Sequence, residues 1–295
     1  MSIAWIKPLL KTMRPRQWVK NGLLFIPLIF DKQLTNWPAL TRTILGFVLF
    51  CLLSSVVYII NDLVDLEADR KHPQKSLRPL PSGSLKVSTA KAAGIVLTVV
   101  IFIPATLLSL DFALIGLTYL VLNLAYSAWL KHAPILDVMI LASFYVLRVA
   151  AGVSLITVHR FSPWLYVFTT FLALYLGIGK RRAELSLLAE EANSHRKSLG
   201  EYTLPLLDQL ILIVSSSAII TYSLYTFSAP NLPANDVMML TIPFVIYGIF
   251  RYLYLIQVKH YGGEPEEVLL TDRPLQATIL LWILAVVVIF YLSPA

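Results

Sequence analysis

Long apolar runs alternate with short polar segments along most of this 295-residue chain. A helix that crosses a membrane needs about 20 mostly apolar residues. We predict nine such spans, at residues 18–30, 40–61, 87–108, 112–130, 134–155, 162–179, 206–228, 237–257 and 275–292. The first is the weakest, because it is short and contains Pro27. The pattern predicts an all-α, polytopic membrane protein in which short connections join antiparallel neighbouring helices.

Composition and charge agree with a membrane protein. Hydrophobic residues make up 57% of the chain and charged residues only 14%, whereas soluble domains carry about 25% charged residues. A net charge of +7 would point to nucleic acid in a soluble protein, but here the positions of the positive charges explain it, and no nucleic-acid partner is expected. The single cysteine, Cys51, excludes a disulfide framework and a cysteine metal site.

Lysine and arginine are distributed asymmetrically about the predicted spans. With the N-terminus placed in the cytoplasm, 20 of the 24 fall on inner segments and 3 on outer ones, Lys32, Arg42 and Arg160. Positive residues concentrate on the cytoplasmic side of membrane proteins. The remaining one, Arg148, lies within a span. The asymmetry predicts a cytoplasmic N-terminus and places the polar segment that follows the second span on the cytoplasmic side.

Four oxygen-bearing side chains meet at the end of the second apolar run. On a helix turning about 100° per residue, Asn61, Asp62, Asp65 and Asp69 occupy one face. Carboxylates this close repel one another unless a cation lies among them, and Mg²⁺ prefers such oxygen ligands. We expect Asn61 and Asp65 to be the direct ligands, with Asp62 and Asp69 behind them or on a second ion. The alternative is a solvated run of charge.

Basic residues that suit phosphate groups surround this face. Lys75 and Arg78 follow the acidic segment directly, and Tyr58 precedes it on the same face. Tyr58 would donate to a phosphate or sugar oxygen, or would simply belong to the interfacial aromatic belt. Lys20 lies at the start of the first span, where it would reach the site or bind anionic lipid.

Two further segments carry candidate charges. Asp137 begins the fifth span and Arg148 lies about 16 Å along the same face. Arginine this deep in a membrane is costly and usually faces a polar cavity. Lys131 would bind phosphate or only determine topology. Arg181 stands in a GKRRAEL segment, where a helix-stabilising role is the alternative.

The motif NDLVDLEAD at Asn61–Asp69 resembles the NDxxDxxxD motif of the UbiA-type prenyltransferase superfamily. The segments RPRQWVKN, YSAWLKHAPILDV, YVLRVAAG and GEPE…DRPLQ resemble its decaprenyl-phosphate phosphoribosyltransferase branch, and the resemblance covers nearly the whole chain. Superfamily members with aromatic acceptors carry a second DxxxD motif. Here Leu141 stands where the partner of Asp137 would be, which favours the phosphoribosyl branch.

The resemblance implies one domain over residues 1–295, with nine helices around a central cavity open to the cytoplasm of a bacterial-type plasma membrane. It implies an Mg²⁺-dependent transfer of phosphoribose from 5-phosphoribosyl 1-pyrophosphate to a polyprenyl phosphate. Asp65 and Arg148 would be essential for turnover. The substrate phosphates would be bound by Lys20, Tyr58, Asp69, Lys75, Arg78, Lys131, Arg148 and Arg181. Whether the protein forms a homo-oligomer is left open.

Two other functions compete with this one. An aromatic-acceptor prenyltransferase of the same superfamily would use a prenyl pyrophosphate donor and the same ion. A transporter would use Asp65 and Arg148 as an intramembrane relay. The acidic residues gather at one membrane edge, whereas transporter sites usually lie at the midplane, which disfavours the transporter.

Overall fold

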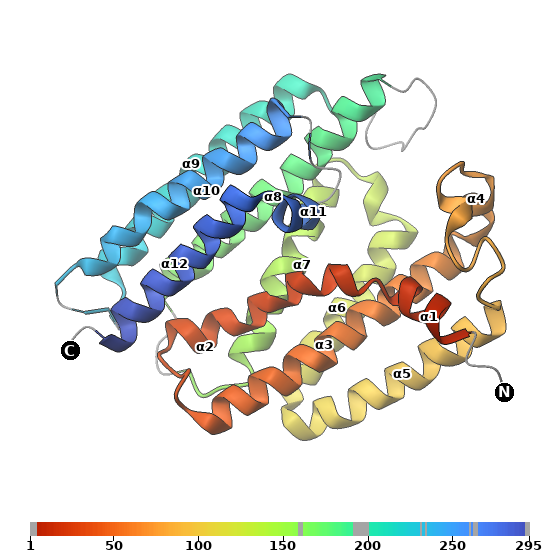
Figure 1. Ribbon diagram of the computed structural model, residues 1–295, viewed down its shortest axis with the longest axis horizontal. Coiled ribbons are helices and arrows are strands. Elements are labelled where there is room, and N and C mark those ends of the chain that lie inside the picture. Colours follow the sequence, from red (N-terminus) through yellow and green to blue (C-terminus); the bar gives the residue numbers. More distant parts are fainter. Residues whose placement is uncertain are drawn as a thin grey trace. The chain divides into compact units, whose positions relative to one another are not determined.

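The computed structural model describes residues 5–158, 162–190, 201–230, 232–233, 235–259, 261 and 265–292, the side chains of 187–190 excepted. Every regular element within those ranges is a helix (Figure 1). The predicted all-α class is therefore confirmed. Arg160, Arg196 and Lys197, which enter the predicted charge asymmetry, lie outside the described residues.

The chain divides into two compact units. The first comprises Met1–Leu28, Leu34–Ala128 and Leu147–Thr157, and the second comprises Ile29–Gln33, Trp129–Val146 and Val158–Ala295. The helices α2 (Ile26–Phe30) and α7 (Leu136–Val153) contribute residues to both. The single domain expected over residues 1–295 stays a prediction.

The first unit is built around one long helix, α3 (Trp37–Val64). Asn36 caps its start by accepting from the Ala39 amide, and Pro38 occupies its first turn. The helix α3 packs against four elements besides α4 (Leu66–Lys71), which follows it directly in the chain. They are α1 (Ile6–Met13), the 3₁₀ helix η2 (Pro15–Phe25), α5 (Val87–Leu108) and α6 (Leu110–Ala128). In the most apolar 18-residue stretch of each helix, 56% of the residues are buried in α3, but only 17% in α5 and 22% in α6. The helices α5 and α6 therefore present mainly outward-facing apolar side chains.

The second unit pairs long helices side by side. The helix α8 (Pro163–Glu190) packs along α9 (Leu204–Ser228), and α10 (Ile242–Gln257) packs along α12 (Arg273–Leu292) (Figure 1). Short elements complete this unit, namely η4 (Leu130–His132), η6 (Val237–Thr241) and α11 (Pro265–Thr271). Rings pack in its interior, where the centroid of Phe30 lies 5.5 Å from that of Tyr225 and 6.0 Å from that of Trp282.

Seven helices in the described part of the chain are long and apolar enough to cross a membrane. They are Trp37–Val64, Val87–Leu108, Leu110–Ala128, Leu136–Val153, Leu204–Ser228, Val237–Gln257 and Arg273–Tyr291. Each coincides with one of the predicted spans. The predicted span 162–179 lies within α8, which is not among the seven. The predicted span 18–30 is formed by η2 and α2, which are both too short to cross as α-helices. Nine spans and a central cavity therefore stay predictions.

The polar segment after α3 is not one continuous helix. The helix α3 ends at Val64, and α4 (Leu66–Lys71) begins one residue later. Asp65 between them has φ −85° and ψ 5°, whereas residues in an α-helix have ψ of about −42°. The Asp65 amide still donates to the Asn61 carbonyl at 2.9 Å, so the change of direction is local. The prediction that one unbroken helix carries Asn61–Asp69 on a single face was therefore wrong, because the helix breaks at Asp65.

One arginine on the predicted outer side has a structural explanation. Arg42 on α3 donates from Nε to the Leu155 carbonyl at 2.9 Å and from a terminal nitrogen to the Leu108 carbonyl at 2.6 Å. Leu108 is the last residue of α5, and the carbonyl groups at a helix end lack partners within the helix. A cation there also complements the helix dipole. Arg42 thus stabilises a helix end, which accounts for an arginine on the predicted outer side.

We expect Gly152→Ala to destabilise the first unit. A Cβ atom at position 152 on α7 would lie 2.2 Å from the carbonyl oxygen of Leu24. Because that neighbour is backbone, it cannot rotate away, and we expect a loss of about 1–3 kcal/mol. The midpoint of thermal unfolding in detergent measures it. Gly248→Ala on α10 is the matched control, since its Cβ would meet nothing within 4 Å. Equal midpoints for the two variants would refute this account of Gly152.

Candidate functional site

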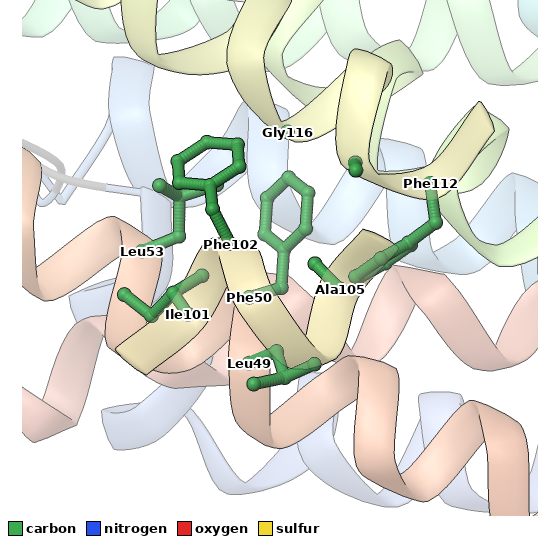
Figure 2. A pocket seen from close by; sticks show the side chains of 9 residues that line it. Leu49, Phe50, Leu53, Ile101, Phe102, Ala105, Phe112 and Gly116 are labelled. Carbon is green, nitrogen blue, oxygen red and sulfur yellow. The ribbon is translucent and has the colours of Figure 1, made fainter. Parts of the chain in front are cut away.

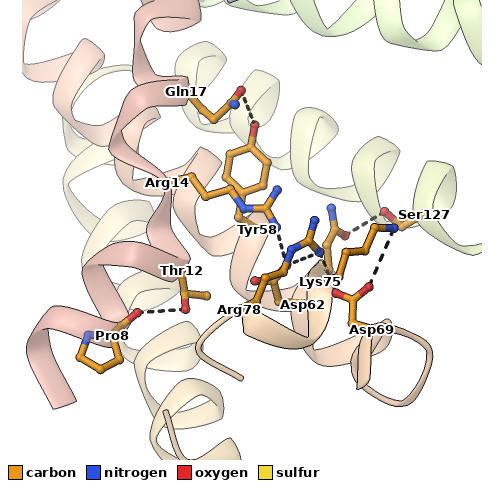
Figure 3. Close-up of polar contacts among 11 residues, drawn as sticks. Pro8, Thr12, Arg14, Gln17, Tyr58, Asp62, Asp69, Lys75, Arg78 and Ser127 are labelled. Atoms are coloured by element: carbon orange, nitrogen blue, oxygen red, sulfur yellow. Dashed lines mark hydrogen bonds and ion pairs between the residues drawn. The ribbon is translucent and has the colours of Figure 1, made fainter. Parts of the chain in front are cut away.

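Carboxylates and cations form ion pairs at the end of α3 in the first unit (Figure 3). Asp62 accepts from the Arg14 guanidinium at 2.6 Å. Arg78 donates to Asp69 at 2.6 Å and lies 3.6 Å from the Asp62 carboxylate. The Lys75 ammonium lies 4.0 Å from Asp69. These five side chains, Arg14, Asp62, Asp69, Lys75 and Arg78, are called the charge cluster below.

Burial separates the two signs of charge within the cluster. The side chains of Asp62 and Asp69 are only 3% and 4% exposed. The side chains of Arg14, Arg78 and Lys75 are 27%, 33% and 46% exposed. The carboxylates therefore lie beneath the cations, and the cluster presents positive charge outward. Such a surface attracts anions.

Asn61 and Asp65 stand apart from these ion pairs. They are one helical turn apart, and Asn61 Oδ1 accepts from the Ser127 hydroxyl of α6 at 2.8 Å, which leaves the oxygen a second lone pair. Among the described residues, no group of three or more His, Cys, Asp or Glu side chains could by itself enclose a metal ion. Two oxygen ligands nonetheless fit Mg²⁺, which commonly takes one or two protein carboxylates and completes its shell with water and substrate phosphate.

Tyr58 lies against the charge cluster from one side. Its hydroxyl donates to Gln17 Oε1 at 3.3 Å, and the Arg14 guanidinium lies 4.8 Å from the centre of its ring. A cation over an aromatic face is attracted by the ring quadrupole. The structure therefore brings Tyr58, Asp69, Lys75 and Arg78 together around the acidic segment, and their contacts with a substrate stay a prediction. Lys20 is partly buried in η2, and its place in the site stays a prediction.

The predicted intramembrane arginine lies in another polar network of the same unit. Arg148 is 4% exposed, donates from Nε to Asn21 Oδ1 at 2.8 Å and donates to the Tyr119 hydroxyl at 2.9 Å. Asn21 in turn donates to Ser54 Oγ at 2.9 Å. These bonds join η2, α3, α6 and α7, so they favour a structural role. The role of Arg148 as a phosphate ligand stays a prediction.

The second unit holds the other two predicted phosphate ligands. Lys131 lies partly buried in η4. Arg181 is fully buried, donates from Nε to Asp137 Oδ2 at 2.6 Å and also bonds Glu184. The Tyr202 hydroxyl donates to Asp137 Oδ1 at 2.6 Å. Burial, and then this hydrogen bond, raise the pKa of Tyr202. A guanidinium this enclosed favours a structural role for Arg181, and its contact with a substrate stays a prediction.

An apolar pocket in the first unit is not the candidate site. It lies among α3, α5 and α6, and Figure 2 shows its side chains, Leu49, Phe50, Leu53, Ile101, Phe102, Ala105, Phe112, Ala113 and Gly116. All nine are apolar or lack a functional group, whereas ligand sites combine apolar walls with a few placed polar groups. The charge cluster, where polar groups meet, is therefore the candidate site.

Sequence reasoning missed three contributors to the site, Arg14, Gln17 and Ser127. Arg14 and Gln17 lie in the N-terminal RPRQW segment, more than 40 residues before the carboxylate and tyrosine that they contact. Their basic and polar character was visible, but their partners were not. Ser127 sits in the YSAW segment, and nothing in its local pattern indicates Asn61 as a partner.

Comparison with known proteins places this arrangement in a family. The model of the UbiA prenyltransferase family matches residues 28–266. A protein of Mycobacterium tuberculosis named decaprenyl-phosphate phosphoribosyltransferase is 35% identical over 280 residues, which cover 94% of this chain and 92% of that protein. A protein of the same name from Mycolicibacterium smegmatis is 34% identical, with 98% and 94% covered.

A solved structure shares the fold. The structure of a UbiA homolog from Archaeoglobus fulgidus bound to GPP and Mg²⁺ has a TM-score of 0.72. It is 21% identical in sequence, and the match covers 96% of this chain and 99% of that one. The family match extends over most of the chain, and the chain belongs to the UbiA prenyltransferase family.

Proposed function

We propose that this protein transfers phosphoribose from 5-phosphoribosyl 1-pyrophosphate to a polyprenyl phosphate of the decaprenyl type and releases pyrophosphate. One observation carries the proposal. The chain is 33–35% identical, over nearly its whole length, to proteins named decaprenyl-phosphate phosphoribosyltransferase. The charge cluster supports it, because partly exposed cations above buried carboxylates suit a substrate with several phosphate groups.

The reaction is a displacement at the ribose. An oxygen of the lipid phosphate forms a bond to C1, the bond from C1 to pyrophosphate oxygen breaks, and the electron pair leaves with pyrophosphate. The attacking oxygen is already anionic, so no side chain has to remove a proton. The demand on the protein is therefore to position both phosphates and to neutralise the charge that grows on the leaving group.

The residues of the acidic segment divide that work. Asn61 and Asp65 would hold Mg²⁺, which when bound neutralises the leaving pyrophosphate as a Lewis acid. Lys75 and Arg78 would bind phosphate oxygens of the donor, Asp69 would orient both of them, and Tyr58 would donate to a phosphate or ribose oxygen. Lys20 and Lys131 would bind further phosphate oxygens, as the sequence predicts. The sequence also predicts phosphate contacts for Arg148 and Arg181, but their buried hydrogen bonds favour structural roles.

The location follows from the charge distribution along the chain. We propose a multi-pass protein of a bacterial-type plasma membrane, with nine crossings and with the N-terminus and the charge cluster in the cytoplasm. The seven apolar helices of the described residues support a multi-pass protein. The excess of lysine and arginine on predicted inner segments supports the orientation. A cytoplasmic cluster would meet a soluble donor, while the lipid acceptor would arrive from the bilayer.

Purified protein incubated with Mg²⁺, 5-phosphoribosyl 1-pyrophosphate and radiolabelled polyprenyl phosphate is expected to form lipid-linked phosphoribose. Thin-layer chromatography and a mass spectrum of the lipid identify the product. A parallel reaction supplies a prenyl pyrophosphate and an aromatic acceptor. Prenylation of that acceptor without lipid-linked phosphoribose would replace the proposal with the aromatic-acceptor reaction.

Asp65→Asn is expected to lower the rate of transfer by about 100-fold or more, because it removes an anionic ligand of the ion while changing little volume. Initial rates at saturating Mg²⁺ and donor measure the loss, and the thermal midpoint in detergent confirms that the fold is kept. Glu67→Gln is the matched control, since the Glu67 side chain is 79% exposed and pairs with Arg70. If Asp65→Asn and Glu67→Gln were equally active, Asp65 would not be a ligand.

A further inference from the structure

Arg14 has an unusual, left-handed backbone conformation. Arg14 ends α1 with φ 51° and ψ 63°, in the left-handed region, where its amide donates to the Lys11 carbonyl. Glycine or asparagine normally fills such a position, because a Cβ atom is strained there. Any of several residues could supply the amide, so the arginine side chain needs a separate reason. An outlier held in place by its surroundings is a guide to function.

The surroundings of Arg14 hold its side chain from two directions. Asp62 accepts from one terminal nitrogen at 2.6 Å, and the Tyr58 ring lies under the guanidinium with its centre 4.8 Å away (Figure 3). A guanidinium has five N–H donors in a rigid fork. The bond to Asp62 uses one of them, and the side chain remains 27% exposed. Arg14 is therefore fixed in position and still has donors for a ligand.

Arg78 shares the same carboxylate. Its terminal nitrogen lies 3.6 Å from the Asp62 oxygen that Arg14 binds, and it donates to Asp69 at 2.6 Å. Asp62 thus lies buried between two partly exposed guanidinium groups. Within the charge cluster, three cations face two carboxylates, which leaves one net positive charge. Paired, planar guanidinium groups suit phosphate oxygens, which they bind in a bidentate manner.

We propose that Arg14 and Arg78 form a guanidinium clamp for the diphosphate of the donor substrate, and that Asp62 is the positioning residue that holds the clamp. This rests on the proposed function for the identity of the donor. The clamp adds Arg14 to the substrate-binding residues and gives Asp62 a task other than binding metal. It also makes the N-terminal segment, through Arg14, part of the donor site.

Steady-state kinetics of Arg14→Gln tests the clamp. Glutamine keeps the backbone amide and the same strained conformation, so the substitution removes only the guanidinium. We expect KM for 5-phosphoribosyl 1-pyrophosphate to rise by about 10- to 100-fold, as for the loss of a hydrogen bond to a charged group. KM for polyprenyl phosphate should stay unchanged. Arg14→Lys should recover part of the loss, because it restores charge without the fork. Arg16→Gln is the control, since Arg16 is an exposed neighbour.

Asp62→Asn tests the positioning role. If Asp62 acts through the guanidinium groups, Asp62→Asn should raise the donor KM, and the double variant with Arg14→Gln should cost less than the sum of the two single variants. Additive effects on donor KM would overturn the role of Asp62. A donor KM for Arg14→Gln equal to that of Arg16→Gln would overturn the clamp. Failure of both Arg14→Gln and Arg14→Lys to give folded protein would also overturn it, because Arg14 would then be structural.

Binding of inorganic pyrophosphate with Mg²⁺, measured by calorimetry, separates this proposal from the proposed function. The clamp predicts that Kd for pyrophosphate rises in Arg14→Gln and not in Arg16→Gln. If the wild-type protein binds pyrophosphate in this Arg14-dependent way but forms no lipid-linked phosphoribose, the clamp stands and the proposed donor is wrong. If it forms lipid-linked phosphoribose and Arg14→Gln binds pyrophosphate normally, the clamp is wrong and the function stands.

Discussion

The candidate site depends on two buried carboxylates that must be neutralised by residues from other segments. A buried charge without a partner costs several kcal/mol, so Asp62 and Asp69 are stable only while Arg14, Arg78 and Lys75 stay in place. Arg14 comes from the N-terminal segment. Lys75 begins the short 3₁₀ helix η3 (Lys75–Leu77) after α4, and Arg78 directly follows that helix. The same electrostatic demand that stabilises the carboxylates therefore gathers three cationic side chains at the end of α3.

The sequence predicts what depends on local pattern. Seven of the spans read from apolar runs coincide with apolar helices, because one long run of such side chains is enough to specify a membrane helix. The acidic segment was equally visible, since its oxygens follow within nine residues. The break at Asp65 was not, because the helical wheel assumes unbroken geometry through the segment. The pairing of Arg14 with Asp62 was not visible either, because 48 residues separate them.

The roles of the two buried arginines, Arg148 and Arg181, depend on contacts that only the structure shows. An arginine within a membrane span is expected to be functional, because its burial is costly. Arg148 meets that cost with Asn21 and Tyr119 inside the first unit. Arg181 lies beyond the predicted span 162–179, but it is also buried, and Asp137 neutralises it inside the second unit. Each network ties together helices of its own unit. The sequence can therefore identify a costly buried charge, but only the contacts decide whether the fold or a ligand compensates it.

Burial also divides the acidic segment into two kinds of carboxylate. Asp62 and Asp69 are enclosed by guanidinium and ammonium groups, so a divalent ion placed on them would have to displace those cations. Asp65 lies at the break between α3 and α4, one turn from Asn61, and has no side-chain ion pair among the described residues. An ion on Asn61 and Asp65 would leave the guanidinium groups in place. A diphosphate could then be neutralised from two sides, by the ion and by the cations that the buried carboxylates hold.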